Sequence, residues 1–149
     1  MLNSRFLIRK LTPDDLDEVM AIEEYSFLSP WSRSSYLSEI ANEFATYLVC
    51  DWEGQIAGYI GAWVVFEDAH ITNVAVNRDF RGKGVGKALM WAVEDMARKK
   101  KAGRILLEVR PSNHPALKMY EQMGYRITGI RKDYYTDNGE DAFIMAKAL

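Results

Sequence analysis

A strand, a glycine-rich turn and an amphipathic helix follow one another in the middle of the chain. The segment Asn73-Val74-Ala75-Val76 precedes Arg81-Gly82-Lys83-Gly84-Val85-Gly86-Lys87, and an unbroken helical pattern then runs from Ala88 to Lys100. Glycines at alternate positions leave backbone N–H groups accessible where a helix begins, and the positive end of the helix dipole lies at the same place. This unit predicts a loop that binds a phosphate or pyrophosphate group.

The spacing of the glycines distinguishes this loop from two common phosphate-binding motifs. A Walker loop has four residues between its first glycine and the Gly-Lys pair, followed by Ser or Thr. Here Gly82 and Gly86 enclose three residues, and Ala88 follows Lys87. A dinucleotide fingerprint would need glycine at position 87. The pattern that fits is Arg-x-x-Gly-x-Gly, although a glycine-rich turn considered alone can also be a plain connection between a strand and a helix.

Length and composition indicate a single domain over residues 1–149. The chain is long enough to bury a core without disulfides or a structural metal. Its only cysteine, Cys50, lies in an apolar run typical of a buried side chain. With 19 Lys and Arg against 21 Asp and Glu, the net charge of −2 gives no overall field to attract nucleic acid or a membrane. Because neither a signal peptide nor a bilayer-spanning apolar run is evident, we expect a cytoplasmic protein.

The periodicity of apolar residues predicts an alternation of strands and helices, with the order β-α-α-β-β-β-α-β-α-β-β and hence an α/β (α+β) class. Strands are expected at 6–9, 46–52, 55–66, 70–76, 104–109, 125–135 and 141–147, and helices from residue 12, from residue 32, at 88–100 and at 115–123. In the second helix, Tyr36, Leu37 and Ile40 are expected to share one side. Asn138-Gly139 is a strong hairpin signal between the last two strands.

A second segment that carries chemistry lies between residues 107 and 125. It contains Leu107-Glu108-Val109-Arg110, Ser112-Asn113, Ala116-Leu117, Tyr120-Glu121 and Gly124-Tyr125. Together with the Arg-x-x-Gly-x-Gly loop, Trp31-Ser32 and Glu140-Asp141-Ala142, it resembles the GCN5-related N-acetyltransferase (GNAT) superfamily, and within it the ribosomal-protein-alanine N-acetyltransferases of the RimI type. The resemblance extends from about residue 6 to the C-terminus. It implies the acetyltransferase fold, a mixed central sheet flanked by helices, which has the order of elements predicted above.

The resemblance implies an enzyme that transfers the acetyl group of acetyl-CoA directly to an amine. Glu108 matches the general base of the family and Tyr120 its general acid. The loop from Arg81 to Lys87 is implied to bind the pyrophosphate, while Val74, Ala75 and Val76 are implied to bind the acetyl and pantetheine groups and Asn113 another part of the cofactor. The residue types suit this chemistry, because an α-ammonium group with a pKa of about 8 loses its proton readily and a phenol can protonate a departing thiolate.

Each candidate residue also has a purely structural interpretation. Glu108 alternates with apolar residues and fits a solvent-facing strand carboxylate, Tyr120 fits a core aromatic, and Asn113 fits a helix cap. The family match favours the functional interpretation of Glu108. His70 and His114 have no Cys, His or carboxylate partner at ligand spacing in the sequence, so no metal is expected.

The acceptor implied by the resemblance is a protein N-terminus, and most specifically the N-terminal alanine of small-subunit ribosomal protein eighteen. Trp31, Tyr134 and Tyr135 match positions that surround the peptide in related N-terminal acetyltransferases. Neighbouring carboxylates either attract a basic peptide or form a solvated acidic rim; they are Glu23, Glu24, Asp137, Glu140 and Asp141. The alternatives are activity on other N-termini or small amines, an inactive acetyl-CoA sensor, and a different binder of nucleotide phosphates.

Overall fold

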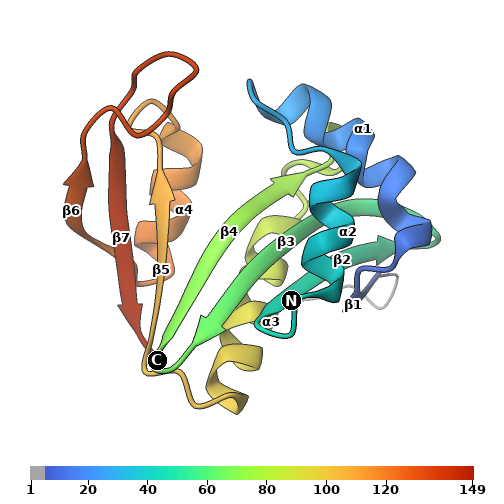
Figure 1. The fold of residues 1–149 in the computed structure, drawn as a ribbon, viewed down its shortest axis with the longest axis horizontal. Helices are drawn as coiled ribbons and strands as arrows, with labels where there is room; N and C mark the ends of the chain where they lie inside the picture. Colours follow the sequence, from blue (N-terminus) through green and yellow to red (C-terminus); the bar gives the residue numbers. More distant parts are fainter. Residues whose placement is uncertain (1–5) are drawn as a thin grey trace.

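The computed structural model describes residues 6–149 and shows a seven-stranded mixed sheet with helices on both faces (Figure 1). The strands are β1 (Phe6–Lys10), β2 (Ala45–Trp52), β3 (Gln55–Val65), β4 (Asp68–Val76), β5 (Arg104–Val109), β6 (Arg126–Arg131) and β7 (Ala142–Ala148). The helices are α1 (Leu16–Ser26), α2 (Arg33–Ala41), α3 (Val85–Lys99) and α4 (His114–Gln122). The predicted fold class and order of elements are confirmed.

Two antiparallel units make up the sheet, whose strand order is β1-β2-β3-β4-β5-β7-β6. Strands β1 to β4 pair as antiparallel neighbours, and so do β5, β7 and β6. The two units are joined by three parallel residue pairs only, Asp68 with Arg104, Ala69 with Ile105 and His70 with Leu106. Beyond these pairs β4 and β5 diverge, as Figure 1 shows. The sheet is therefore split over most of the length of these two strands.

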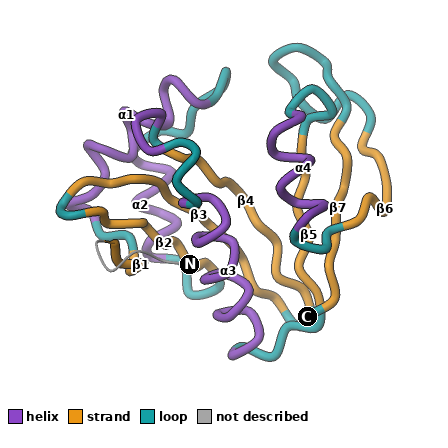
Figure 2. Tube along the Cα trace, turned by 180° about the vertical axis from the view of Figure 1, so that it is seen from behind, coloured by secondary structure: helices purple, strands orange, loops and turns teal. Residues whose placement is uncertain are grey.

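Helices α1 and α2 cover one face of the β1–β4 unit, and α3 covers the other (Figures 1 and 2). The first layer buries Leu16, Val19 and Tyr36, whereas α3 buries Leu89 and Val93. Leu37 was expected beside Tyr36 but is 44% exposed. Successive helix residues point about 100° apart, so the inward orientation of Tyr36 turns Leu37 toward solvent.

The predicted strand at 125–135 ends earlier than the sequence suggests. β6 stops at Arg131, and residues 132–141 form a long loop that contains Asn138-Gly139 instead of a tight hairpin turn. Two features interrupt the strand: Asp133 adopts a positive φ of 53°, and the following residues are tied to the end of β5 by side-chain contacts described below. Tyr134 and Tyr135 consequently lie in a loop and not in a strand.

The α3 helix carries a buried carboxylate that connects it to the C-terminal strands. Glu94 is 2% exposed, and its oxygens accept hydrogen bonds from the Tyr125 hydroxyl at 2.7 Å and from Lys147 Nζ at 3.0 and 3.2 Å. A buried carboxylate is tolerated only where such partners replace water. Glu94 thus holds α3 against β7 at the narrow end of the split sheet.

The lone cysteine, Cys50, has the buried position expected for it. Cys50 is fully buried, and burial raises the pKa of its thiol to about 11. Among residues 6–149, no helix combines the length and the apolar composition needed to cross a bilayer.

Replacing Glu94 by alanine is expected to lower the free energy of unfolding by about 2 to 3 kcal/mol, because the substitution leaves the Lys147 ammonium and the Tyr125 hydroxyl without their partner. Asp95→Ala is the matched control. Because the Asp95 side chain is 70% exposed, its removal should lower the free energy of unfolding by about 0.5 kcal/mol or less. Urea denaturation of both variants measures the difference. Equal losses for the two variants would contradict the structural role of Glu94.

Candidate active site

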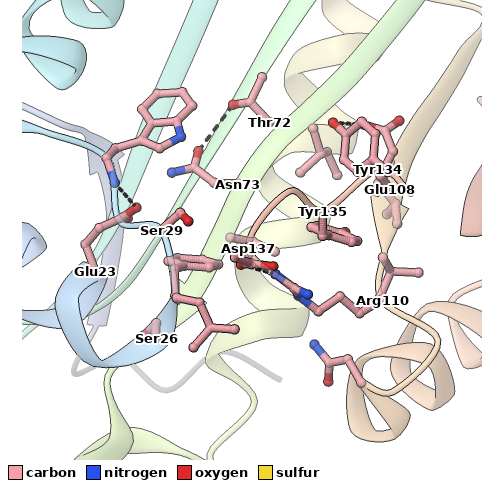
Figure 3. Close-up of a pocket in the computed structure, with 18 of the residues that line it drawn as sticks. Glu23, Ser26, Ser29, Thr72, Asn73, Glu108, Arg110, Tyr134, Tyr135 and Asp137 are labelled. Atoms are coloured by element: carbon pink, nitrogen blue, oxygen red, sulfur yellow. Dashed lines mark hydrogen bonds and ion pairs between the residues drawn. The ribbon is translucent and has the colours of Figure 1, made fainter. Parts of the chain in front are cut away.

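The divergence of β4 and β5 opens a pocket of about 470 Å³ in the middle of the sheet. Its walls come from β4 (residues 71–74), β5 and its end (107–110), the α1–α2 connection (26–31), α4 and the β6–β7 loop (134–137). Figure 3 shows Glu108 and Tyr134 on one side and Glu23 and Ser29 on the other, with β4 between them. Segments far apart in the sequence thus meet around one cavity.

A β-bulge in β4 directs two consecutive polar side chains toward the α1–α2 side. Gly61 pairs with Asn73 and Ala62 pairs with Ile71, which leaves Thr72 without a partner on β3. Thr72 Oγ1 lies 2.8 Å from the Tyr47 hydroxyl. Asn73 Nδ2 donates to the Tyr36 hydroxyl at 2.6 Å. Gly61 is required here, because a Cβ at this position would lie 2.2 Å from the Tyr47 ring.

The α1–α2 connection is fixed by the buried carboxylate of Glu23, which is 1% exposed. Glu23 accepts hydrogen bonds from the backbone N–H of Trp31 at 2.8 Å and from the hydroxyls of Tyr36 and Tyr59 at 2.6 and 2.5 Å. The expectation that Glu23 belongs to a solvated acidic rim is therefore wrong. Its carboxylate is fully hydrogen-bonded inside the protein, where it stabilises the loop that ends at Trp31.

Two further carboxylates of the expected acidic rim are paired as well. Asp137 and Glu140 each form an ion pair with the Arg110 guanidinium, at 2.6 and 3.3 Å. Asp141 Oδ1 accepts a hydrogen bond from the backbone N–H of Asp133 at 2.9 Å. Most of the carboxylates near the pocket thus shape the protein, and the attraction of a basic peptide by free acidic groups loses its main support.

Glu108 is positioned on β5 just beyond the last residue pair with β4, and its side chain is 8% exposed. Both carboxylate oxygens lie close to His70 Nε2, at 2.7 and 3.0 Å, and the Tyr134 hydroxyl donates to Oε1 at 3.4 Å. Burial raises the pKa of Glu108, but the hydrogen bond and charge of His70, the charge of Arg131 and the Tyr134 hydroxyl outweigh burial and bring the pKa below its ordinary value. Glu108 is accordingly a carboxylate anion at neutral pH.

His70 is a residue of this site that the sequence does not reveal. No carboxylate lies at ligand spacing from it in the sequence, yet Glu108 contacts it across the sheet. The partner is supplied by the parallel register that places His70 beside Leu106, two residues before Glu108. Such a register cannot be read from local spacing. The His70 side chain is 38% exposed and so connects the carboxylate with solvent.

Tyr120 and Asn113 also line the pocket. Tyr120 is 5% exposed, its ring packs against Tyr125, and burial raises the pKa of its hydroxyl. Within the part of the chain that the structure describes, no group hydrogen-bonds to this hydroxyl. The Asn113 side chain caps α4 by accepting from the Ala116 N–H at 3.3 Å, as predicted. This bond uses Oδ1 and leaves the Nδ2 donor for another ligand.

The glycine loop has the geometry expected of an anion site. Gly82 and Gly84 have φ values of 77° and 82°, a region that residues with a Cβ rarely adopt, and α3 begins at Val85, three residues earlier than predicted. The backbone N–H groups of residues 81–87 find no hydrogen-bond acceptor among the described residues. Lys83 Nζ lies 5.7 Å from the centre of the Trp52 ring, which helps to hold the loop.

The strand segment Val74-Ala75-Val76 leads from the pocket to the glycine loop. It pairs with Ile60, Tyr59 and Gly58 of β3 on one edge. On its other edge the pairing with β5 has already ended at His70. The backbone groups on that edge are therefore available to an extended ligand lying in the split.

Aromatic side chains form the two outer walls of the pocket. Tyr134 and Tyr135 stand edge to face with ring centres 5.0 Å apart, and Trp31 on the opposite wall packs against Tyr36 at 5.3 Å. All three predicted acceptor residues thus border the same cavity as Glu108 and Tyr120. Among residues 6–149, no three His, Cys, Asp or Glu side chains gather as a metal site would require, and a metal-free reaction stays a prediction.

The split sheet, the glycine loop and the pocket together define an acetyltransferase. The family model described as the Acetyltransferase (GNAT) family matches residues 16–125, and the chain belongs to this family of N-acetyltransferases, whose members use acetyl-CoA.

More particular similarities point to the enzymes that modify a ribosomal protein. A Bacillus subtilis protein named provisionally as a [ribosomal protein bS18]-alanine N-acetyltransferase is 44% identical over 145 residues, which cover 97% of this chain and 96% of that protein. The Escherichia coli [ribosomal protein bS18]-alanine N-acetyltransferase is 33% identical over 93% of this chain and 95% of its own. The crystal structure of the Escherichia coli enzyme superposes with a TM-score of 0.88, covering 97% of this chain and 94% of that one. Chaetomium thermophilum Naa20, crystallised with a bisubstrate analogue, gives 0.86 at 29% identity, covering 96% and 86% of the two chains.

Removing the His70 imidazole should raise the pKa of Glu108, because the hydrogen bond and the charge that oppose burial disappear together. The variant His70→Ala, with side-chain carboxylates labelled with carbon-13, allows the titration of Glu108 to be followed by NMR. His114→Ala is the matched control, since His114 makes no contact with Glu108 and its removal should leave the titration unchanged. An unaltered pKa in His70→Ala would show that the pair seen in the structure does not govern the ionisation of Glu108.

Proposed function

We propose that this N-acetyltransferase acetylates the N-terminal α-amine of a protein, with Glu108 as general base and Tyr120 as general acid. The observation that carries the proposal is that a buried carboxylate anion and a buried, unpartnered phenol line one pocket at the split between β4 and β5. The preferred acceptor is the N-terminal alanine of ribosomal protein bS18. This choice is supported by relatives named for that activity, to which the chain is similar over nearly their whole length.

The residues present fit acetyl-CoA as the acetyl donor. The free N–H groups of the loop from Arg81 to Lys87 suit its pyrophosphate, and the open edge of Val74-Ala75-Val76 suits its pantetheine arm. The Nδ2 group of Asn113 supplies a further donor. The cofactor contributes an acetyl thioester, from which the amine nitrogen takes the acetyl group as the C–N bond forms and the C–S bond breaks.

Glu108 receives the proton that the attacking amine loses. A carboxylate whose pKa lies below its ordinary value is a weak base, but the attacking neutral amine becomes a far more acidic N–H cation as its nitrogen bonds to the carbonyl carbon. His70, hydrogen-bonded to the carboxylate and partly exposed, offers the proton a route to solvent. The base therefore acts chiefly through its position at the end of β5.

Tyr120 protonates the departing thiolate. Burial raises the pKa of its hydroxyl, so the proton is present throughout the neutral range. Burial disfavours a thiolate in the pocket as it disfavours a phenolate, so the two effects oppose each other and the thiolate stays a suitable acceptor for the phenol's proton. The unpartnered hydroxyl is free to make that contact.

A peptide acceptor fits the walls of the pocket better than a small amine does. Trp31 on one side and Tyr134 and Tyr135 on the other provide flat apolar surfaces for an extended chain, whose amine would point toward Glu108. Broader specificity for protein N-termini is the second candidate, and it is supported by the similarity to Naa20 bound to a bisubstrate analogue. A sensor without turnover is disfavoured by the intact pair of Glu108 and Tyr120.

This function is tested by measuring acetyl-CoA turnover, with the release of the free CoA thiol as the readout. A peptide that begins Ala-Arg-Tyr-Phe is compared with the same peptide blocked at its α-amine and with a panel of polyamines and aminoglycosides. We expect turnover with the free peptide only. Turnover with small amines only would retain the family and overturn the acceptor, and cofactor binding without any turnover would establish a sensor.

The variant Glu108→Gln is expected to lose about a hundredfold in kcat/KM at neutral pH and less at high pH, where the free amine is already abundant. Because the pKa of Glu108 is lowered, its carboxylate is ionised across this range, and the rate of the unmodified enzyme should rise with pH as the peptide amine deprotonates. The measurement is a pH profile of kcat/KM for both proteins. Glu121→Gln, on the exposed side of α4, is the control. A profile that the Glu108 substitution leaves unchanged would remove Glu108 as the base.

A further inference from the structure

The Arg110 side chain gathers most of the contacts that fix the β6–β7 loop. Nη2 donates to Asp137 Oδ2 at 2.6 Å, and Nη1 donates to Asn138 Oδ1 at 3.1 Å and to Glu140 Oε1 at 3.3 Å. The guanidinium also stacks on the Tyr135 ring, with Cζ 3.9 Å from the ring centre. A planar group with several fixed donors and a stacking face is needed for these contacts at once, and lysine provides neither.

The loop has little else to order it. Residues 132–141 form no strand, and most of them are exposed, so packing against the core contributes little. Its internal backbone bonds are those of Tyr135 N–H to Glu140 O at 3.1 Å and Gly139 N–H to Tyr135 O at 2.8 Å. Glu140 is bound to Ser112 as well, through the Ser112 N–H and hydroxyl, both at 3.0 Å. The attachment of this loop to the end of β5 thus depends on Arg110 and Glu140.

The loop reaches the reacting groups directly. The Tyr134 hydroxyl donates a hydrogen bond to Glu108 Oε1 at 3.4 Å, and Tyr134 lines the pocket together with Tyr135 and Asp137. Arg110 directly follows the last residue of β5, two residues after Glu108, and both line the pocket. The end of one strand therefore places the proposed base beside the group that fixes the neighbouring wall.

We propose that Arg110 is a positioning residue that holds Tyr134 and Tyr135 in place as the wall of the acceptor site. The inference rests on the proposed function, since it assigns these tyrosines to the binding of the peptide. Among the described residues, the hydrogen bonds, ion pairs and ring contact of the Arg110 side chain all go to the β6–β7 loop and none to the glycine loop or to Val74-Ala75-Val76, which assigns it to the acceptor side of the pocket. Its loss should weaken the peptide and leave acetyl-CoA unaffected.

The experiment compares Arg110→Ala and Arg110→Lys with Arg104→Ala. Arg104 is the first residue of β5, at the opposite and exposed end from Arg110, and forms an ion pair with Asp68 at 2.8 Å, so it provides a matched control. For Arg110→Ala we expect KM for the peptide to rise about tenfold, because a displaced wall misplaces the acceptor. KM for acetyl-CoA should stay within about twofold, and Arg110→Lys should be intermediate because it retains only the charge.

Hydrogen exchange reports on the loop independently of activity. The amides of Tyr135 and Gly139 should exchange faster in Arg110→Ala and at the original rate in Arg104→Ala. Faster exchange with an unchanged KM for the peptide would overturn the proposal, because the loop would then be ordered by Arg110 without serving the acceptor. A parallel rise in KM for acetyl-CoA would also overturn it, since it would indicate a general structural effect.

A double-mutant cycle tests whether Arg110 acts through Asp137. Asp137→Asn alone should raise KM for the peptide, and the combination with Arg110→Ala should raise it no further than Arg110→Ala does. Additive effects would contradict a shared role. The unmodified enzyme is assayed first: absence of peptide turnover there overturns the proposed function, whereas a failure confined to the variants overturns the role of Arg110.

Discussion

The early end of the pairing between β4 and β5 is the constraint on which the rest of this structure depends. Three residue pairs hold the two halves of the sheet together, and beyond them each strand keeps one unpaired edge. Unpaired backbone groups inside a protein require another partner. An extended ligand can provide it, and the glycine loop at the far end of β4 presents further N–H groups in continuation of the same path. In the proposed mode of cofactor binding, the contacting surface is mainly backbone, and side chains are left to perform the chemistry and to select the acceptor.

Charged groups fix the two loops that flank this split, one on each side. Glu23 satisfies its buried carboxylate with a backbone N–H and two tyrosine hydroxyls, and Arg110 satisfies its guanidinium with oxygens of the opposite loop. A half-satisfied buried charge costs several kcal/mol, so the arrangement around Glu23 is stable only when all its contacts are made. Arg110, whose side chain is 24% exposed, holds its loop through several contacts made at once.

Sequence reasoning succeeded where the signal is local and failed where it depends on pairing between distant segments. The glycine turn before α3, the cap at Asn113 and the order of elements were predicted because each follows from nearby residues. The partnership of His70 with Glu108 was missed because a parallel register joins them across 38 positions. The strand predicted through Tyr135 was too long. The alternation of apolar and polar residues does not reveal the contacts of Arg110 with the residues that follow Arg131. Burial of Glu23 was missed for the same reason.

The ionisation of Glu108 bears directly on its proposed role as the general base. An ordinary carboxylate and an α-amine differ by about 3.5 units of pKa, so complete proton transfer before attack would cost about 5 kcal/mol, and the lowered pKa of Glu108 makes that cost larger. Burial alone, in an apolar wall, would raise the pKa of Glu108 and make it a stronger base. The protein instead surrounds the carboxylate with His70, Arg131 and Tyr134. For the proposed reaction the neutral amine attacks, because an ammonium nitrogen has no lone pair, and this arrangement favours an anion that orients the amine and receives its proton as the C–N bond forms. The rate then depends on alignment more than on basicity.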